Sequence, residues 1–257
     1  MTELLTPAPG AAPATRMVAA QAAAELRAWL RNGEQLLLTL IIPTLLLALF
    51  SLVPLFDVGT ASRVDFLAPG VIALAVMSTS FTGLAIATGF ERRYGVLKQL
   101  GATPLPRWGL LTAKSIAVLG VEVLQVTLLV AVAWALGWQP RASALGCATI
   151  ALFLLLGTVA FSGLGLLMAG TLRAEATLAA ANLVYVVLLA LGGVVFPLSR
   201  FPGWLQPVLE LLPISALAEG LRAVLRHGEA LPGHALTVLA VWAVVALTAA
   251  SLTFKWD

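Results

Sequence analysis

Six long apolar segments constrain the fold of this chain more than any other feature of its sequence. They cover roughly residues 36–56, 66–90, 110–137, 145–169, 177–196 and 234–254. About 20 apolar residues in helical conformation cross the hydrocarbon core of a bilayer. Because unpaired backbone groups are costly in lipid, each segment is expected to be a helix. The sequence therefore predicts an all-α integral membrane protein with six transmembrane helices.

The composition excludes a water-soluble globule. Hydrophobic residues make up 60% of the chain and charged residues only 11%, whereas soluble domains carry about 25% charged residues. The formal charge of +3 comes from few residues, and none of the Lys/Arg clusters resembles a nucleic-acid-binding arm. We therefore expect the lipid bilayer, and no nucleic acid, as a partner.

The positive charges that flank the apolar segments predict the orientation of the chain, because cytoplasmic loops are enriched in Lys and Arg. With the N-terminus in the cytoplasm, ten positive residues lie inside: Arg16, Arg27, Arg31, Arg92, Arg93, Lys98, Arg107, Lys114, Arg173 and Lys255. Five lie outside: Arg63, Arg141, Arg200, Arg222 and Arg226. Both termini are therefore expected in the cytoplasm, and residues 35–257 are expected to form the membrane domain.

The N-terminal region divides into two parts. Residues 1–15 are rich in Pro and Ala and are expected to be a disordered cytoplasmic tail. Residues 16–34 predict an amphipathic helix lying in the interface with Trp29 at headgroup depth. Its apolar face would hold Val18, Ala22, Trp29 and Leu30, and its polar face Gln21, Glu25, Arg27 and Arg31. The alternative is a plain cytoplasmic extension of the first span.

Residues 91–107 form a basic, partly amphipathic segment between the second and third spans. Tyr94, Leu97 and Leu100 recur at helical spacing, which predicts a short helix with one apolar face. Pro104 and Pro106 are expected to end it. Such a helix can bury its apolar face on a partner protein. The alternative is an ordinary basic loop lying on lipid headgroups.

Residues 197–233 precede the last span and cannot be one spanning helix, because they contain several prolines and charges. Apolar residues nevertheless recur at helical spacing, as in Leu217, Leu221 and Val224. This pattern predicts two short helices at, or dipping into, the outer membrane surface.

Motifs for catalysis are missing from the sequence. There is no G-x-x-x-x-G-K-[ST] phosphate loop and no H-E-x-x-H zinc motif, and Cys147 is the single cysteine. We therefore expect no catalytic residues, no metal site and no enzyme activity in this chain.

Polar residues within the apolar segments are the better functional candidates. Glu122 and Gln125 lie near the middle of the third segment, where a carboxylate is costly unless it faces a partner or a cavity. They indicate either a polar element of a translocation pathway or a bond that holds the bundle together. Asn182 and Tyr185 in the fifth segment are further candidates for the pathway.

Small residues recur at four-residue spacing, at Thr79, Gly83 and Ala87 and again at Gly165 and Ala169. This spacing lets helix backbones approach closely. The contacts would lie either within one chain or between two copies.

Taken in order, these elements resemble the ABC-2 type permeases, the membrane subunits of type V ABC exporters that include drug- and antibiotic-resistance permeases. The resemblance also includes Pro43 in the first span, and its most specific piece is ERRYGVLKQLGATP. Glu91, Arg92 and Gly95 match the family pattern, whereas Arg93 replaces its second Glu. In the family this segment is the coupling helix that docks on the ATPase. The resemblance implies that role for Glu91, Arg92, Arg93, Tyr94, Gly95, Leu97, Lys98 and Leu100.

The resemblance also implies the function and the partners. The chain would be a permease that pairs with a separate ATP-binding cassette subunit and with a second copy or a related permease. ATP and Mg would bind the partner, with no cofactor on this chain, and the complex would export a drug, lipid or glycolipid across a bacterial inner membrane. The outer helical pair would form a gate with Phe196, Pro197, Trp204 and Pro213. The alternative is an ATP-independent carrier or scaffold that uses Glu122 as an ion site.

Overall fold

The computed structural model describes residues 12–53 and 62–253, and these residues form helices and loops without any strand. Six helices are long and apolar enough to cross a membrane: α2 (Gly33–Leu52), a continuous helix over Arg63–Arg93, α6 (Arg107–Ala135), α7 (Ala144–Thr171), α8 (Ala174–Leu191) and α11 (Gly233–Thr253). The second of these consists of α3 (Arg63–Met77), the π-helical turn η2 (Ser78–Gly83) and α4 (Leu84–Arg93). For the described residues, the expectation of an all-α protein with six helices able to span a membrane is confirmed.

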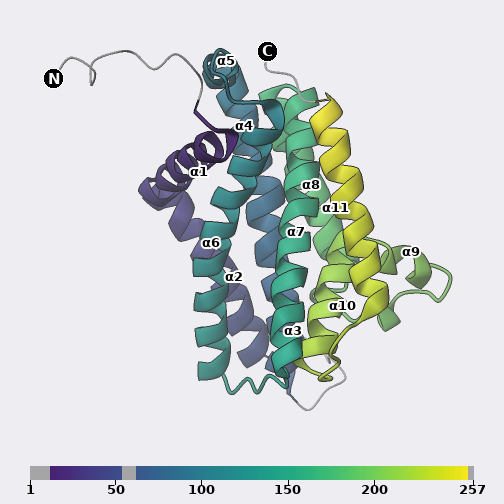
Figure 1. Ribbon diagram of the computed structural model, residues 1–257. Coiled ribbons are helices and arrows are strands. Elements are labelled where there is room, and N and C mark those ends of the chain that lie inside the picture. The colour runs from purple at the N-terminus through teal and green to yellow at the C-terminus, as the bar shows by residue number, and fades with distance from the viewer. Residues whose placement is uncertain (1–11, 54–61, 254–257) are drawn as a thin grey trace.

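The spans run alternately up and down, and shorter helices lie at both ends of the bundle (Figure 1). At one end are α1 (Ala14–Arg31), α5 (Val96–Gly101) and the last turn of α11, and we call this the α5 end. Toward the other end lie η3 (Leu198–Arg200), α9 (Gln206–Glu210) and α10 (Pro213–Leu225), and we call this the α10 end.

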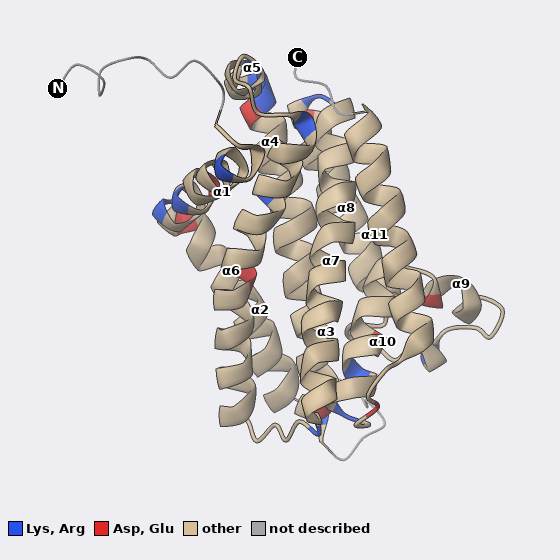
Figure 2. Ribbon diagram, viewed as in Figure 1, with Lys and Arg blue, Asp and Glu red and all other residues tan. Residues whose placement is uncertain are grey.

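Charged residues gather at the two ends, whereas the middle of the bundle is almost free of them (Figure 2). The described positive residues of the α5 end are Arg16, Arg27, Arg31, Arg92, Arg93, Lys98, Arg107, Lys114 and Arg173. Those of the α10 end are Arg63, Arg141, Arg200, Arg222 and Arg226. The ends therefore differ in positive charge as the sequence pattern predicts.

Glycines set the closest helix contacts of the core. A Cβ at Gly163 of α7 would lie 2.8 Å from the backbone of Ala246 in α11, so only glycine lets these two helices pack this tightly. A Cβ at Gly165 would lie 2.8 Å from the carbonyl oxygen of Phe81 in η2. The small residue Gly83 faces the ring of Trp29. Gly83 and Gly165 therefore serve packing within one chain.

Trp29 packs against the bundle, and its depth relative to the lipid headgroups stays a prediction. Its side chain is 7% exposed, and its Cη2 atom lies 2.9 Å from the ideal Cβ position of Gly83. The tryptophan thus packs on the second span, because the missing side chain of Gly83 leaves room for its ring. Leu30, expected on the same face, is 46% exposed. Helix α1 therefore packs on the bundle through Val18, Ala22 and Trp29.

The fifth span is shorter than expected and ends at Leu191 instead of residue 196. Gly192 and Gly193 follow, and Gly193 has a φ of 66°, a left-handed conformation that favours glycine. These glycines end the helix and turn the chain toward α10. Within the outer pair, α10 buries Leu217, Leu221 and Val224, but α9 is only five residues long. Residues 1–11 of the expected tail lie outside the described residues, and Ala14 already begins α1.

Candidate functional site

The segment that joins the second and third spans is two helices with a break, not one continuous helix. Helix α4 ends at Arg93, and α5 begins at Val96. Between them Gly95 adopts a φ of 77°, in the left-handed region that residues with a Cβ avoid. The expected face with Tyr94, Leu97 and Leu100 in one helix is therefore wrong, because Tyr94 precedes this break. The glycine turns α5 away from the axis of α4.

The break gives the apolar residues of this segment different environments. Leu97 is fully buried in an apolar cluster with residues of α1 and α6, including Val18 and Leu110. Tyr94 is 72% exposed and Val96 is 41% exposed. In this conformation Leu97 fixes α5 to its own chain and is not accessible to a partner. The exposed surface of the turn instead carries Tyr94, Val96, Lys98 and Gln99, with Leu100 half-buried.

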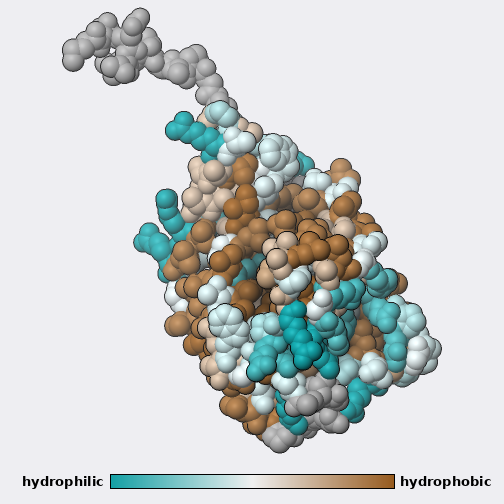
Figure 3. Space-filling model, turned by 60° about the horizontal axis from the view of Figure 1, so that its bottom comes forward, coloured by the Kyte–Doolittle hydropathy of each residue, from teal (hydrophilic) through white to brown (hydrophobic). Residues whose placement is uncertain are grey.

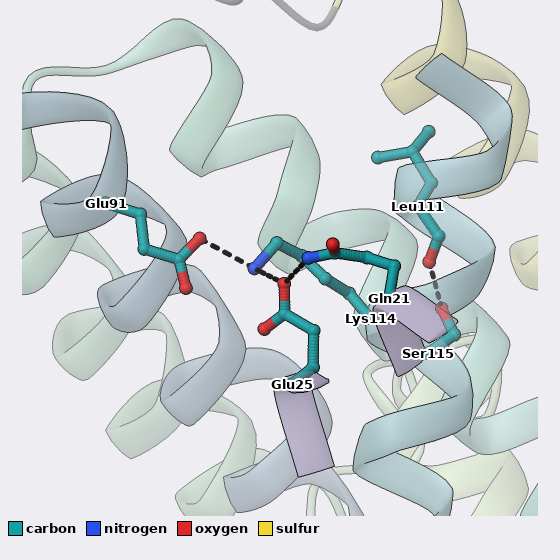
Figure 4. A network of polar contacts seen from close by, with 6 residues as sticks. All are labelled: Gln21, Glu25, Glu91, Leu111, Lys114 and Ser115. Carbon is teal, nitrogen blue, oxygen red and sulfur yellow. Dashed lines mark hydrogen bonds and ion pairs between the residues drawn. The ribbon is translucent and has the colours of Figure 1, made fainter. Parts of the chain in front are cut away.

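A buried ionic cluster lies directly beneath this segment (Figure 4). The Lys114 ammonium of α6 is 2.6 Å from Oε2 of Glu91 in α4 and 2.9 Å from Oε1 of Glu25 in α1. The amide of Gln21 also donates a 2.9 Å hydrogen bond to Glu25. The Lys114 side chain is 1% exposed, so both ion pairs are largely removed from water. The cluster ties α1, the end of the second span and the start of the third span together.

Arg92 and Arg93 attach the same segment to the loop between α7 and α8 and to the first turn of α8. Arg92 donates a hydrogen bond to the carbonyl oxygen of Leu172, and Arg93 forms an ion pair with Glu175. Three of the residues expected to dock on an ATPase, Glu91, Arg92 and Arg93, thus contact their own chain. The turn is therefore braced against α1, α6 and α8 together.

A second polar group lies in the middle of the bundle. Glu122 of α6 is 3% exposed and shares a hydrogen bond with the hydroxyl of Thr158 in α7. Thr158 also donates to the carbonyl oxygen of Leu154 at 2.8 Å. The Thr158 hydroxyl has a single hydrogen and two acceptors within reach, Oε2 of Glu122 and the carbonyl oxygen of Leu154. The second oxygen of Glu122, Oε1, is buried without a hydrogen-bond partner among the described residues.

Gln125 bonds to two other spans. Its side-chain oxygen accepts a 3.0 Å hydrogen bond from Thr79 in η2, and its amide donates at 2.7 Å to the carbonyl oxygen of Thr39 in α2. Through these bonds Gln125 links α6 to η2 and α2, as expected of a residue that holds the bundle together. The widened π-helical turn brings the Thr79 hydroxyl to this position, and such turns recur at functional sites.

The other two candidates for a pathway lie on α8. Asn182 is exposed and donates to the carbonyl oxygen of Leu178 in its own helix, while Tyr185 is half-buried. No hydrogen bond within the described part of the chain joins Glu122, Gln125, Asn182 and Tyr185 to one another. Their role in a pathway stays a prediction.

The α10 end contains a cavity of about 520 Å³ with charged walls, including Glu219, Arg222, Arg226 and His234. From this end, hydrophilic side chains cover much of the surface (Figure 3). Arg222 is 2% exposed and donates to three backbone carbonyls, those of Phe66, Gly193 and Val194. It also pairs with Glu219 at 2.7 Å. Burial lowers the pKa of Arg222 from its usual value, and the carboxylate of Glu219 opposes this effect.

The residues expected to form an outer gate occupy different environments. Pro197 lines the cavity, and Pro213 is buried at the start of α10. Phe196 is 45% exposed and Trp204 is 78% exposed. Their role at a gate stays a prediction.

Sequence reasoning did not foresee the partners that hold these sites. The sequence places Glu25, Lys114 and Arg222 in or beside predicted helices, but it does not reveal which other helices they bond to. It does not single out Thr158 at all. The position of Lys114 could have indicated a buried charge, because this lysine lies seven residues inside a span that begins at Arg107. The run STSFTG within the apolar second segment is a further signal, because it marks the π-helical turn. Within the described residues, no group of three or more His, Cys, Asp or Glu side chains could hold a metal ion.

Comparison with known proteins shows the family of this chain. The family model described as ABC-2 type transporter matches residues 18–225. A protein of Porphyra purpurea described as a transport permease, ycf38, is 31% identical over 211 residues, which cover 77% of this chain and 70% of the relative. The family match covers most of α1, the Gly95 turn with its ionic cluster, and α10. This multi-pass membrane protein belongs to the ABC-2 type transporter family, whose members are transport permeases.

Proposed function

We propose that this chain is the membrane-spanning permease of an ATP-driven exporter, and that a separate ATP-binding cassette subunit binds and hydrolyses MgATP. The α5 end would face the cytoplasm, because it carries most of the positive charge. Both termini would then lie in the cytoplasm of a bacterial cell, next to the inner membrane. Two copies, or this chain and a related permease, would enclose the path of a hydrophobic or amphipathic cargo such as a drug, lipid or glycolipid.

The observation that supports this proposal best is the braced turn at the α5 end. Helix α5 projects beyond the ends of the spans (Figure 1), and it presents exposed Tyr94 and Val96 beside Lys98. An exposed aromatic residue with a neighbouring cation is typical of the anchor residues of protein interfaces. The ATPase would bind here and fix its register through Lys98.

The ionic cluster would transmit a movement of this surface to the membrane-spanning helices. Glu91 and Lys114 connect the last turn of the second span to the first turns of the third span, and Glu25 adds α1. Because these contacts are buried and charged, the three elements would move together when the ATPase closes on ATP. The second and third spans would then change their packing at Glu122 and Gln125.

The test of docking is copurification of the ATPase with a variant that carries Tyr94→Asp and Val96→Asp. We expect the native full-length chain to bring an ATP-binding cassette subunit from its own membranes. Losing anchor contacts should lower the recovered ATPase by about tenfold or more. Leu97 is left unchanged because it is buried in the chain itself. Quantitative mass spectrometry measures the ratio of ATPase to permease.

The matched control is Trp204→Asp, which removes an exposed aromatic side chain at the α10 end. It should leave the recovered ATPase unchanged. Equal recovery with the double variant, or no ATPase with the native chain, would contradict docking at α5.

A substitution at Glu122 distinguishes the ATP-driven permease from a second candidate function, the ion-coupled carrier. The observation that favours the carrier is the buried carboxyl group of Glu122, whose Oε1 has no hydrogen-bond partner among the described residues. We expect Glu122→Gln to keep ATP-dependent export, because glutamine has the same shape and can still bond to Thr158. The measurement is the retention of a fluorescent amphiphilic dye in cells, with and without an active ATPase. Loss of export in Glu122→Gln, together with export that needs no ATPase, would show the ion-coupled carrier.

A further inference from the structure

Three arginines line a pocket at the α5 end that the docking surface does not include. The pocket has a volume of about 360 Å³ and lies between α4 and α8. Its walls are formed by Gly89, Arg92, Arg93, Arg173, Ala174 and Glu175. Three arginines and one glutamate are among these residues, so the pocket has an excess of positive charge.

Contacts within the chain neutralise only part of this positive charge. Glu175 pairs with Arg93, and Arg92 donates to a neutral carbonyl oxygen, that of Leu172. The Arg173 side chain forms neither a hydrogen bond nor an ion pair within the described residues. Two positive charges therefore remain without an anionic partner in a concave site, and guanidinium groups match the oxygen atoms of a phosphate.

The depth of the pocket indicates where such a phosphate comes from. Ala174 is the first residue of the fifth span, and Arg93 is the last residue of the second. The pocket thus lies where the apolar spans end, at the level of the lipid headgroups. Helix α5 extends farther from the bundle than this level (Figure 1).

The flank of α8 below the pocket suits an acyl chain. Leu178 is 39% exposed, Leu183 66% and Val186 57%. A basic pocket above an exposed apolar helix face matches a molecule with an anionic head and an apolar tail. A free phosphate ion would use the pocket alone.

We infer that this pocket binds the phosphate headgroup of an anionic phospholipid from the leaflet on the α5 side, with its acyl chains along α8. Arg173 is the main ligand, because its side chain has no other partner among the described residues. Arg92 and Arg93 belong to the turn that carries the docking surface, so a bound lipid also contacts the segment that joins the second and third spans. The site does not depend on the cargo or on the ATPase.

Native mass spectrometry of the purified, delipidated full-length chain tests this site. Phosphatidylglycerol and phosphatidylcholine are titrated separately, and the bound lipid is counted. Each cation near a lipid phosphate contributes on the order of 1 kcal/mol, or about fivefold in affinity, so the two unpaired charges should make phosphatidylglycerol bind about 25-fold more tightly. Arg173→Ala should reduce this preference about fivefold. Arg173→Lys should keep most of it, because the charge remains.

The matched control is Arg107→Ala, which removes the same charge at the same end from an exposed position outside the pocket. It should leave the preference unchanged. An equal loss in the two alanine variants, or no preference in the native chain, would overturn the site. If inorganic phosphate binds in an Arg173-dependent way without any preference for phosphatidylglycerol, the ligand is a free phosphate and the lipid assignment fails.

Discussion

Replacing Lys114 by methionine should lower the free energy of unfolding by about 3–5 kcal/mol, the cost of leaving a buried ion without its partner. Methionine has a similar length and is apolar, so it fills the space of the lysine. It leaves the carboxylates of Glu25 and Glu91 facing each other without a cation. The measurement is chemical unfolding of the purified chain in detergent micelles. Lys98→Met, an exposed lysine of α5, should change stability by less than about 0.5 kcal/mol.

A compensated variant separates the loss of charge balance from the loss of packing. Combining Lys114→Met with Glu25→Gln and Glu91→Gln removes all three charges and keeps the shapes of the side chains. Most of the lost stability should return, since neutral replacement of a buried ion group is often tolerated. If the triple variant is as unstable as Lys114→Met alone, the ion pairs do not explain the effect of Lys114.

Replacing Arg222 by methionine should also lower the free energy of unfolding by about 3 kcal/mol or more. Its guanidinium satisfies the carbonyl oxygens of Phe66, Gly193 and Val194, and each buried acceptor left unpaired costs about 1–3 kcal/mol. It also lies 3.9 Å from the ring centroid of Phe66. The expected result is a lower unfolding midpoint in the same micelle assay, with loosening of the Gly193 turn visible as faster hydrogen exchange.

Arg222→Lys should recover only part of this stability, because an ammonium group cannot reach three carbonyls with the fixed fork of a guanidinium. Arg226→Met is the control on the next turn, since Arg226 lines the same cavity but is only half-buried. It should have a small effect. Equal stability of the lysine variant and the native chain would show that charge alone, and not the bonds to the backbone, is what Arg222 supplies.

Local composition predicts much of this fold. The apolar segments indicate the six spans, the prolines 104 and 106 precede the third span, and the charge pattern distinguishes the two ends. The basic, amphipathic pattern of residues 91–107 identifies the segment between the second and third spans. The geometry within this segment could not be predicted, because apolar residues that recur every three positions do not reveal that Gly95 adopts a left-handed conformation.

The candidate site was predicted only in part. Glu122 and Gln125 were identified because polar residues are rare in apolar segments, but their partners Thr158 and Thr79 belong to other spans. Tyr94 is exposed, whereas Leu97 is buried by α1 and α6. A hydrophobic residue on a short helix has the same sequence pattern whether it faces a partner protein or its own bundle.

The sequence by itself determined the number of spans, their approximate ends and the difference in charge between the two ends. These properties depend on the thickness and polarity of the bilayer, which act on each segment separately. Only the tertiary structure decided the neighbours: Glu25 with Lys114 and Arg222 with Phe66, which are 156 residues apart. A buried charge is stable only when another helix brings its counterpart, so its role depends on how the helices pack together.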